Sequence, residues 1–308
     1  MIIHYFIILL IITLFIIIFI YSSKSKNMNQ QSSILKINHN SGFFSCCTIR
    51  LQNILDYYKK YNRIPDLVDS SAQFSYYKSA NDKDITYLLF QNDQLINVKF
   101  NKDIYIFSSS NKENQFSEYY KINFQDTNPF ILKYFTPSIN IQNIVNNLIN
   151  KYNIDFDNTC AVMYRGNDKI LETNQPSYQD IYEKTIEIRN KHNNIRFLLQ
   201  TDELEFLNYG LQKFPNSFHI EETPKINKQV SSIQLLNKFD KNHLMNYISS
   251  IIIMSKCKYI ITTSGNGEMW MILWRGNTNN VHQYLNPKEY IYGVYNPSFD
   301  KNMKNFWI

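Results

Sequence analysis

The stretch Thr159-Cys-Ala-Val-Met-Tyr-Arg-Gly-Asn-Asp-Lys169 decides the fold. Its apolar run, residues 160–164, ends abruptly in five polar or small residues, a pattern that predicts a buried strand running into a polar loop. In open α/β sheets, ligands bind beyond the carboxyl ends of the strands. Arg165 is therefore a candidate anion ligand, because a guanidinium binds phosphate through two parallel hydrogen bonds. An ordinary strand end with a solvated turn is the alternative interpretation.

Strands and helices alternate on from this stretch. The predicted strands lie at 159–164, 195–199, 217–220 and 259–262, and the predicted helices at 178–192, 204–213, 244–256 and 268–274. This spacing predicts a parallel, doubly wound sheet. A further helix at 139–148 precedes them, with Thr136 as its N-cap and Pro137 at the first helical position. We place a domain boundary here, between residues 32–135 and 136–308.

The first half also has an α/β pattern. A strand at 34–37, a helix at 48–61 and a strand beginning at Leu67 form a strand–helix–strand unit. Short strands are predicted at 85–90, 95–100 and 104–107. The fold class that the whole chain indicates is therefore α/β.

The chain opens with an almost wholly apolar run, residues 1–21. About 20 such residues span a bilayer as a helix, and neither a basic n-region nor a small-residue cleavage site indicates a removable signal peptide. We predict one uncleaved transmembrane anchor, followed by a polar tether at 22–31. Lys24 and Lys26 follow the run, so the positive-inside rule favours a cytosolic body. We expect a single-pass protein of an ER- or Golgi-like endomembrane, with its orientation left open.

The composition argues against several classes of protein. The 308 residues are 44% hydrophobic, which is ample for a core, and seven glycines and eight prolines argue against a low-complexity chain. The net charge of +6 is scattered without a basic run, so we predict no nucleic-acid partner. The four cysteines form no Cys-x-x-Cys pair, so no zinc or redox motif is indicated.

Polar groups follow three of the predicted strands, at 165–169, 201–203 and 262–267. Parallel strands would bring all three to one edge of the sheet. The third group opens a helix, whose unpaired N–H groups and positive dipole end attract anions, and contains Ser264, Gly265, Asn266 and Gly267. Asp202 is placed to accept hydrogen bonds from a ribose or a base, or else to cap the helix that follows. With Arg165 these residues predict a pyrophosphate site without a metal, and a plain helix-capping turn at 264–267 is the alternative.

Two Asp-x-Asp pairs, Asp82/Asp84 and Asp155/Asp157, have the form of a motif that holds a divalent metal on a nucleotide sugar. Such pairs arise easily by chance in a chain this rich in Asn and Asp. We predict no metal site, and keep a metal-dependent transferase using Asp82 and Asp84 as an alternative. Walker, G-x-G-x-x-G, G-x-S-x-G and H-E-x-x-H motifs are missing from the sequence, so hydrolase, P-loop and nicotinamide functions have no support.

In their order and spacing these segments resemble the fucosyltransferase superfamily, which includes the α1,6-, α1,2- and protein O-fucosyltransferases. The resemblance covers residues 135–276 and rests on Phe135-x-Pro-Ser138, Met163-Tyr-Arg-Gly-Asn-Asp-Lys169, Leu199-Gln-Thr-Asp-Glu203 and Thr262-Thr-Ser-Gly-Asn-Gly267. It implies a GT-B fold of two Rossmann-like domains, the first on the acceptor side and the second binding GDP-fucose. It also implies an inverting reaction that requires no metal or other cofactor.

The family's motif is His-x-Arg-Arg-x-Asp-Lys. Met163 takes the place of its histidine and Gly166 that of its second arginine, whereas Arg165, Asp168 and Lys169 match it. The resemblance implies that Arg165 contacts the β-phosphate and stabilises the leaving group. It also implies that the serine-containing loop at 264–267 holds the pyrophosphate.

An inverting displacement needs a base within hydrogen-bond reach of the acceptor hydroxyl. Glu172 lies nearest to the family's loop carboxylate, and Asp168 and Glu222 are further candidates. We therefore expect a membrane-anchored glycosyltransferase that moves a sugar, fucose first among the candidates, from a GDP-linked donor to a glycan or protein acceptor. The alternative is an inactive relative that binds nucleotide sugar or glycan, since Met163 and Gly166 depart from the motif.

Overall fold

The computed structural model describes residues 33–79, 81–91, 118–225 and 240–285, together with residues 13, 116, 227 and 307–308. Apart from Thr13, the predicted anchor and tether lie outside this part of the chain, as do the strands predicted at 95–100 and 104–107. Among the helices that the structure describes, none is both long and apolar enough to cross a membrane.

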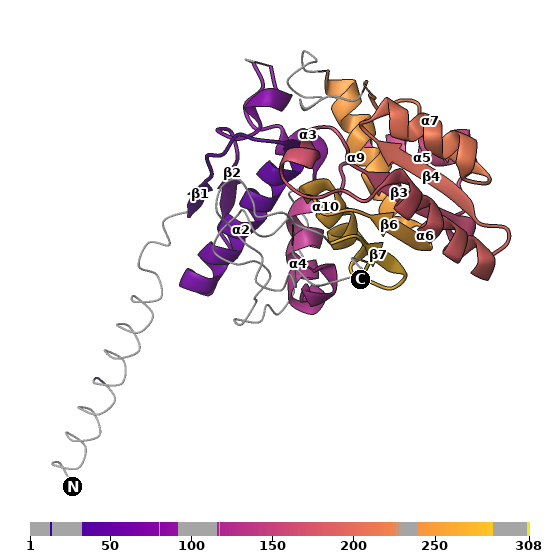
Figure 1. Cartoon of the computed structure of the whole chain (residues 1–308). Coiled ribbons are helices and arrows are strands. Elements are labelled where there is room, and N and C mark those ends of the chain that lie inside the picture. The colour runs from indigo at the N-terminus through magenta and orange to yellow at the C-terminus, as the bar shows by residue number, and fades with distance from the viewer. Residues whose placement is uncertain are drawn as a thin grey trace, which may run out of the picture.

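The C-terminal part is built on a five-stranded parallel sheet in the order β5-β4-β3-β6-β7 (Figure 1). Its strands are β3 (Thr159–Tyr164), β4 (Arg196–Thr201), β5 (Ser217–His219), β6 (Tyr259–Thr262) and β7 (Val281–Gln283). The first strand of this sheet along the chain, β3, is the central one. The next two, β4 and β5, lie on one side of it, and β6 and β7 lie on the other. This is the doubly wound arrangement that the alternation predicts.

Helices cover both faces of this sheet because successive residues of β3 point to opposite sides. Cys160, Val162 and Tyr164 belong to one buried apolar cluster, with residues of α6 and α7. Ala161 and Met163 belong to another, with residues of α5, α9 and α10. The helices are α5 (Ile139–Tyr152), α6 (Tyr178–Lys191), α7 (Leu204–Lys213), α9 (Lys241–Lys256) and α10 (Asn266–Arg275).

The N-terminal part contains the predicted strand–helix–strand unit, at one side of the molecule in Figure 1. It consists of β1 (Ile34–Lys36), α2 (Phe43–Tyr61) and β2 (Leu67–Asp69), with the two strands parallel. The helix begins before the predicted residue 48, because Phe43 and Phe44 are buried in its first turn. The cluster that contains Met163 extends into α2 and α4 (Phe124–Phe135), so the two parts of the chain share one apolar core.

Two local predictions were wrong, and one helix was missed. Residues 85–90 form no strand: the Asp84 carboxylate accepts hydrogen bonds from the Thr86 N–H and hydroxyl, at 2.9 and 2.6 Å, and the short helix α3 (Thr86–Leu89) follows. The N-cap of α5 is Ser138 and not Thr136. Helix α4 was missed because Pro129 lies inside it and interrupts the helical pattern. The domain boundaries, and a second Rossmann-like domain, stay predictions.

Candidate active site

The strand order places one crevice at the carboxyl edge of the sheet. β4 and β5 lie on one side of β3 while β6 and β7 lie on the other, so the loops after β3 and β6 diverge in opposite directions. Such a topological switch point is where open α/β sheets bind ligands. Arg165 follows β3 directly, and the segment 263–267 follows β6. Two of the predicted strand ends therefore meet at the switch point.

Arg165 is held at this edge by two carboxylates. Its Nε donates to Asp202 Oδ2 at 2.8 Å, and its Nη2 donates to Asp168 Oδ1 at 3.0 Å. Burial alone would lower the pKa of Arg165, but neighbouring acidic groups, Asp202 above all, raise it well beyond its ordinary value. We call Arg165, Asp168 and Asp202 the arginine cluster.

Asp202 serves this cluster and does not cap a helix. The N-cap of α7 is Glu203, whereas Asp202 Oδ1 also accepts from the Gly166 N–H at 3.4 Å. The buried Asn167 amide donates to the Asp202 carbonyl at 2.9 Å. The capping alternative for Asp202 is therefore wrong, because its side chain is engaged by the loop after β3.

Lys169 and Glu172 form a second pair beside the cluster. They lie on the 3₁₀ turn η5 (Asp168–Leu171) and directly after it, with Lys169 Nζ 2.5 Å from Glu172 Oε2. Glu222, the third candidate base, lies elsewhere. Its carboxylate binds Lys151 Nζ at 2.8 Å and the Tyr152 hydroxyl at 2.7 Å, both on α5. The structure thus brings Asp168 into contact with Arg165 and keeps Glu222 with α5.

The loop after β6 turns its side chains toward the protein. The Ser264 hydroxyl donates to the Tyr284 carbonyl at 3.2 Å and accepts from Gln283 Nε2 at 3.1 Å. Asn266 Oδ1 lies 2.9 Å from the Thr48 hydroxyl of α2. The N-cap residue of α10 is Gly265, which has no side chain to cap the helix. A role for this loop in binding pyrophosphate therefore depends on the backbone N–H groups of α10, and it stays a prediction.

The glycines of this loop make room for protein groups. The backbone of Gly265 is extended, and a Cβ there would lie 2.3 Å from Glu268 Oε2. A Cβ on Gly267 would lie 3.2 Å from Met163 Cε and 3.0 Å from the Tyr247 hydroxyl. The sequence predicted that these glycines let the backbone approach a ligand closely. In the structure they let it approach side chains of α9, α10 and β3.

Glu268 is a residue of the site that the sequence analysis missed. It lies in the first turn of α10, has no solvent exposure, and its Oε2 has no hydrogen-bond partner within the part of the chain that the structure describes. Burial raises its pKa, and the charges of Arg165 and Lys169 oppose that effect only in part. The signal that could have revealed it is an acidic residue in the first turn of a helix that follows a glycine-rich loop.

The N-terminal part also reaches this site. The Tyr119 hydroxyl donates to the Thr263 carbonyl at 3.1 Å, and the Tyr77 hydroxyl accepts from the Phe43 N–H of α2 at 2.8 Å. Burial raises the pKa of Tyr77, and Arg165 lies close enough to oppose that rise. The arginine cluster therefore lies where the two parts of the chain meet.

The two departures from the family motif have local physical reasons. A Cβ on Gly166 would lie 1.7 Å from Glu203 Oε2 and 2.6 Å from Tyr164 Cε1, so a second arginine has no room unless both side chains move. Met163 is fully buried and packs on the α9 and α10 side of the sheet. A polar side chain there would lie in an apolar core.

Three of the four Asp-x-Asp carboxylates have other partners. Asp82 binds the Ser79 N–H at 2.9 Å and Lys241 Nζ at 3.1 Å, whereas Asp84 binds the backbone at Ser70 and Thr86. Asp155 caps the turn that begins at Phe156. Within the described residues, no group of three or more His, Cys, Asp or Glu side chains has the geometry of a metal site.

No protein-family model matches the chain, and no curated protein matches it. Solved structures do. The crystal structure of NodZ α1,6-fucosyltransferase soaked with GDP-fucose matches with a TM-score of 0.50 at 10% identity, over 82% of this chain and 95% of that one. NodZ co-crystallised with GDP gives a TM-score of 0.47 at 11% identity, over 83% and 96%. A structure of NodZ from Bradyrhizobium gives 0.46 at 12%, over 75% and 89%.

The first of these matches, at 10% identity, establishes the fold alone. It spans nearly the whole of the NodZ chain, so the likeness is not confined to the five-stranded sheet. The resemblance inferred from the polar strand ends is thereby confirmed at the level of the fold: this α/β chain has the fold of an α1,6-fucosyltransferase, with Arg165 at its topological switch point.

Proposed function

We propose that the chain is a glycosyltransferase that moves a sugar from a nucleoside-diphosphate sugar to a glycan or protein acceptor. The observation that carries this proposal is the arginine cluster at the switch point of a fold shared with NodZ, a fucosyltransferase whose crystals were soaked with GDP-fucose. A GDP-linked donor and fucose are therefore the first candidates. An inverting, metal-independent reaction and a membrane anchor at residues 1–21, in an endomembrane, complete the proposal.

The two carboxylates on Arg165 would have different roles. The Asp202 side chain is 9% exposed and that of Asp168 is 24% exposed. A diphosphate that enters from solvent would compete with Asp168 for Nη2, while Asp202 keeps Nε in place. Arg165 would then offer a preorganised donor to the oxygen on which charge develops as the sugar–phosphate bond breaks.

The acceptor hydroxyl needs a base, and two carboxylates near the cluster remain candidates. Asp168 would be released from Arg165 when the diphosphate binds, and Glu172 is 23% exposed beside Lys169. Glu222 is the weaker candidate because Lys151 and Tyr152 hold its carboxylate at α5. A carboxylate that leaves a cation becomes a stronger base, since the positive charge had stabilised its ionised form.

Arg165→Ala should lower the transfer rate by about 10²–10³-fold, because the loss of one preorganised donor costs about 3–4 kcal/mol of transition-state stabilisation. Arg165→Lys, which keeps the charge without the planar fork, should give an intermediate rate. The measurement is GDP release from GDP-fucose in the presence of a glycan panel. Arg189→Ala, an exposed arginine on α6, is the matched control. A folded Arg165→Ala protein with full activity would contradict the proposal.

A non-catalytic relative is the second candidate function. Met163 and Gly166, which replace two motif residues, favour it. Calorimetry with GDP, UDP and CDP on the full chain separates the two. Selective binding of one nucleotide without turnover on any acceptor would favour the non-catalytic protein, whereas binding with turnover would favour the enzyme.

A further inference from the structure

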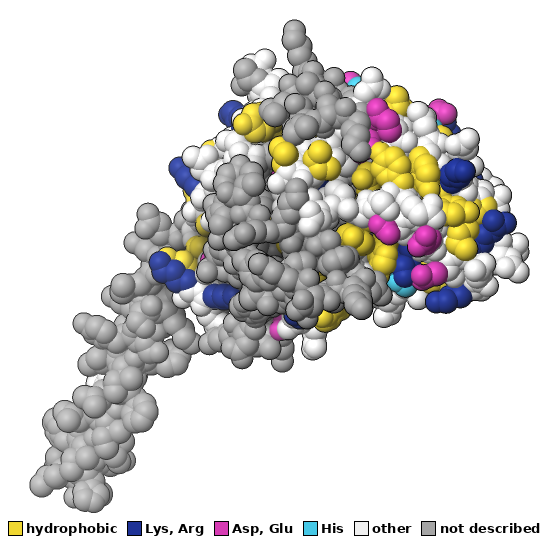
Figure 2. All heavy atoms as spheres, in the orientation of Figure 1, with side chains coloured by type: hydrophobic (Ala, Val, Ile, Leu, Met, Phe, Trp, Pro, Cys, Tyr) yellow, Lys and Arg dark blue, Asp and Glu magenta, His cyan; other side chains and the backbone are white. Residues whose placement is uncertain are grey.

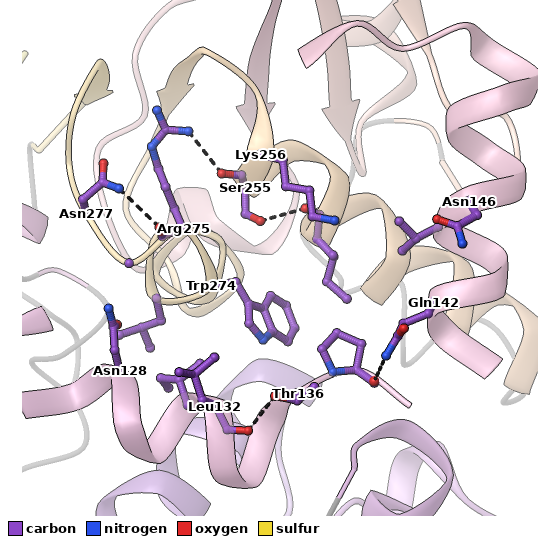
Figure 3. Close-up of a pocket in the computed structure, with 16 residues that line it drawn as sticks. Asn128, Leu132, Thr136, Gln142, Asn146, Ser255, Lys256, Trp274, Arg275 and Asn277 are labelled. Atoms are coloured by element: carbon purple, nitrogen blue, oxygen red, sulfur yellow. Dashed lines mark hydrogen bonds between the residues drawn. The ribbon is translucent and has the colours of Figure 1, made fainter. Parts of the chain in front are cut away.

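A groove of about 770 Å³ between α4, α5, α9 and α10 lies outside the arginine cluster, but its polar groups are largely engaged (Figure 3). The Asn277 amide donates to the Arg275 carbonyl at 3.3 Å and accepts from the Asn279 N–H at 3.0 Å. The Gln142 amide donates to the Pro137 carbonyl at 2.7 Å. This groove therefore offers a ligand few open amides, and a different kind of surface lies on the N-terminal part.

The C-terminal end of α2 and the first residues of β1 and β2 form one edge of the N-terminal part. α2 ends at Tyr61, and residues 62–66 lead from it to β2. Ile34 and Leu67, which begin the two parallel strands, are paired in register. We call residues 33–34 and 57–67 the amino edge. Figure 1 shows it at the side of the molecule away from the five-stranded sheet.

Three large apolar side chains of the amino edge are exposed to solvent. The exposed fraction is 49% for Ile34, 50% for Tyr61 and 42% for Leu67. The Tyr57 ring lies beside Tyr61, with 4.5 Å between the ring centroids, and Lys60 Nζ lies 5.0 Å from the Tyr61 centroid. Single exposed apolar side chains are normal on a protein surface, whereas a group of them marks an interaction surface.

Basic side chains lie among these apolar ones. Lys59 and Lys60 are exposed in the last turn of α2, and Arg63 follows the helix. Within residues 56–67 these three cations face two carboxylates, Asp56 and Asp66, and Asp66 lies 3.9 Å from Arg63. The amino edge therefore carries a net positive charge. Figure 2 shows basic and hydrophobic side chains next to one another at this side of the N-terminal part.

This combination fits the surface of a bilayer better than the surface of a protein. Lysine is depleted in protein–protein interfaces, and two copies of this edge facing each other would bring their cations together. At a bilayer, tyrosine rings lie at the level of the headgroups, and long basic side chains extend their charges to the phosphates. Anionic headgroups attract basic residues near the membrane surface.

The chain that enters the amino edge carries the predicted membrane anchor. The apolar run ends at residue 21, and the amino edge begins at Ser33. Residues 22–32 between them span at most about 40 Å, because a chain advances at most about 3.3–3.6 Å per residue. Two of these residues, Lys24 and Lys26, add to the positive charge. The anchor would therefore keep the amino edge close to a bilayer surface.

We propose that the amino edge docks on the bilayer that holds residues 1–21, against anionic headgroups. This inference rests on the membrane anchor of the proposed function. The other end of α2 reaches the candidate active site, where Phe44 Cδ2 would lie 3.4 Å from a Cβ on Gly267. α2 has 19 residues and is about 28 Å long. Docking at its C-terminal end thus turns the candidate active site away from the bilayer, toward an acceptor in solution.

The test measures the reactivity of Lys59 and Lys60 in the full chain reconstituted into vesicles. Vesicles of phosphatidylcholine alone are compared with vesicles that also contain phosphatidylserine. A membrane-impermeant acetylating reagent modifies the lysines outside the vesicle, and mass spectrometry gives the rate for each one. The exposed Lys213 of α7 is the internal reference, since it lies outside the amino edge. Relative to Lys213, both lysines should react at least about threefold more slowly when phosphatidylserine is present.

A double variant of the apolar side chains tests whether the amino edge itself makes the contact. Tyr61→Ser combined with Leu67→Ser should abolish the protection of the two lysines. Tyr76→Ser combined with Leu211→Ser is the matched control, because these side chains are 50% and 41% exposed and lie outside the amino edge. The control should retain the protection of wild type.

Two results would overturn the docking. One is that the two lysines react equally fast in both kinds of vesicle, and the other is that Tyr61→Ser with Leu67→Ser keeps the protection. Extraction of the chain from the vesicles by alkaline carbonate would show that residues 1–21 do not anchor it, and would overturn the anchor and the docking together. Binding of GDP, measured by calorimetry, depends on neither, so the proposed transferase is judged separately.

Discussion

Arg165 and Glu268 show how single residues set the charge of the candidate site. The guanidinium is paired with Asp168 and Asp202, and the buried Glu268 adds a further acidic group whose pKa is raised by burial. The site thus has more acidic groups than basic ones before any ligand binds. An anionic diphosphate is compatible with it only if a carboxylate moves or carries a proton.

Glu268→Gln should change the pH dependence of stability. Burial raises the pKa of Glu268 above 4.5, so between that value and the raised one the native chain binds more protons than the unfolded chain. The free energy of unfolding of the wild type therefore falls as pH rises through this window. Relative to wild type, the variant should gain stability with rising pH, by about 1.4 kcal/mol for each pH unit of the window's width.

The measurement is urea unfolding of wild type and Glu268→Gln at a series of pH values from 4 to 8. The exposed Glu183→Gln on α6 is the control, because its carboxylate already lies in water. A difference between wild type and Glu268→Gln that stays constant with pH would show that Glu268 has no raised pKa in the native state.

At the scale of elements, the N-cap of α5 is Ser138 and not the predicted Thr136. Thr136-Pro137 predicted the cap, but Ser138 Oγ accepts from the Ile141 N–H at 3.4 Å and donates to the Leu88 carbonyl at 2.7 Å. Ser138→Ala should lower the unfolding free energy by about 1–2 kcal/mol. Thr136→Ala should change it by less than about 0.5 kcal/mol, because the Thr136 side chain is not the cap.

Thermal and urea unfolding of both variants checks this prediction. Equal losses for Ser138→Ala and Thr136→Ala would contradict the assignment of the cap. Thr-Pro is a good start for a helix in isolation. The hydrogen bond from Ser138 to Leu88 joins residues 50 positions apart, so the local sequence could not predict it.

At the scale of the whole molecule, Thr48 joins the two parts of the chain. The Trp270 indole N–H of α10 donates to the Thr48 hydroxyl of α2 at 3.0 Å, and Trp270 is fully buried. Thr48→Val keeps the shape but leaves that N–H without its acceptor. The unfolding free energy should fall by about 1–3 kcal/mol.

Thr185→Val on α6 is the matched control, since its buried hydroxyl donates to the Tyr182 carbonyl of the same helix. Its effect should be clearly smaller than that of Thr48→Val. Urea unfolding measures both. If the two variants lose the same stability, the contact between α2 and α10 contributes nothing beyond the loss of a hydroxyl.

The surface of the C-terminal part carries side chains of several kinds. Figure 2 shows, on the C-terminal part, hydrophobic side chains interspersed with acidic and basic ones on the face in view. The mixture of both signs agrees with a net charge that is scattered along the sequence. A surface of mixed sign gives little long-range attraction to a polyanion, which is consistent with the absence of a basic run in the sequence.

The sequence by itself determined the alternation of strands and helices after residue 136, the parallel sheet, and the position of Arg165 at a strand end. These follow from local periodicity, and each depends on residues within one or two turns or a single strand. The resemblance to fucosyltransferases came from the same strand ends, and a solved α1,6-fucosyltransferase structure confirms it at the level of the fold.

Only the tertiary structure decided which groups meet. Asp202 binds Arg165 across 37 positions, Ser264 faces β7, Glu268 is buried beside the cluster, and Gly166 lacks room for a side chain because of Glu203. Partners so far apart in sequence are set by sheet order and helix packing, which no local pattern encodes, and that is why the strand ends were predictable while their contacts were not.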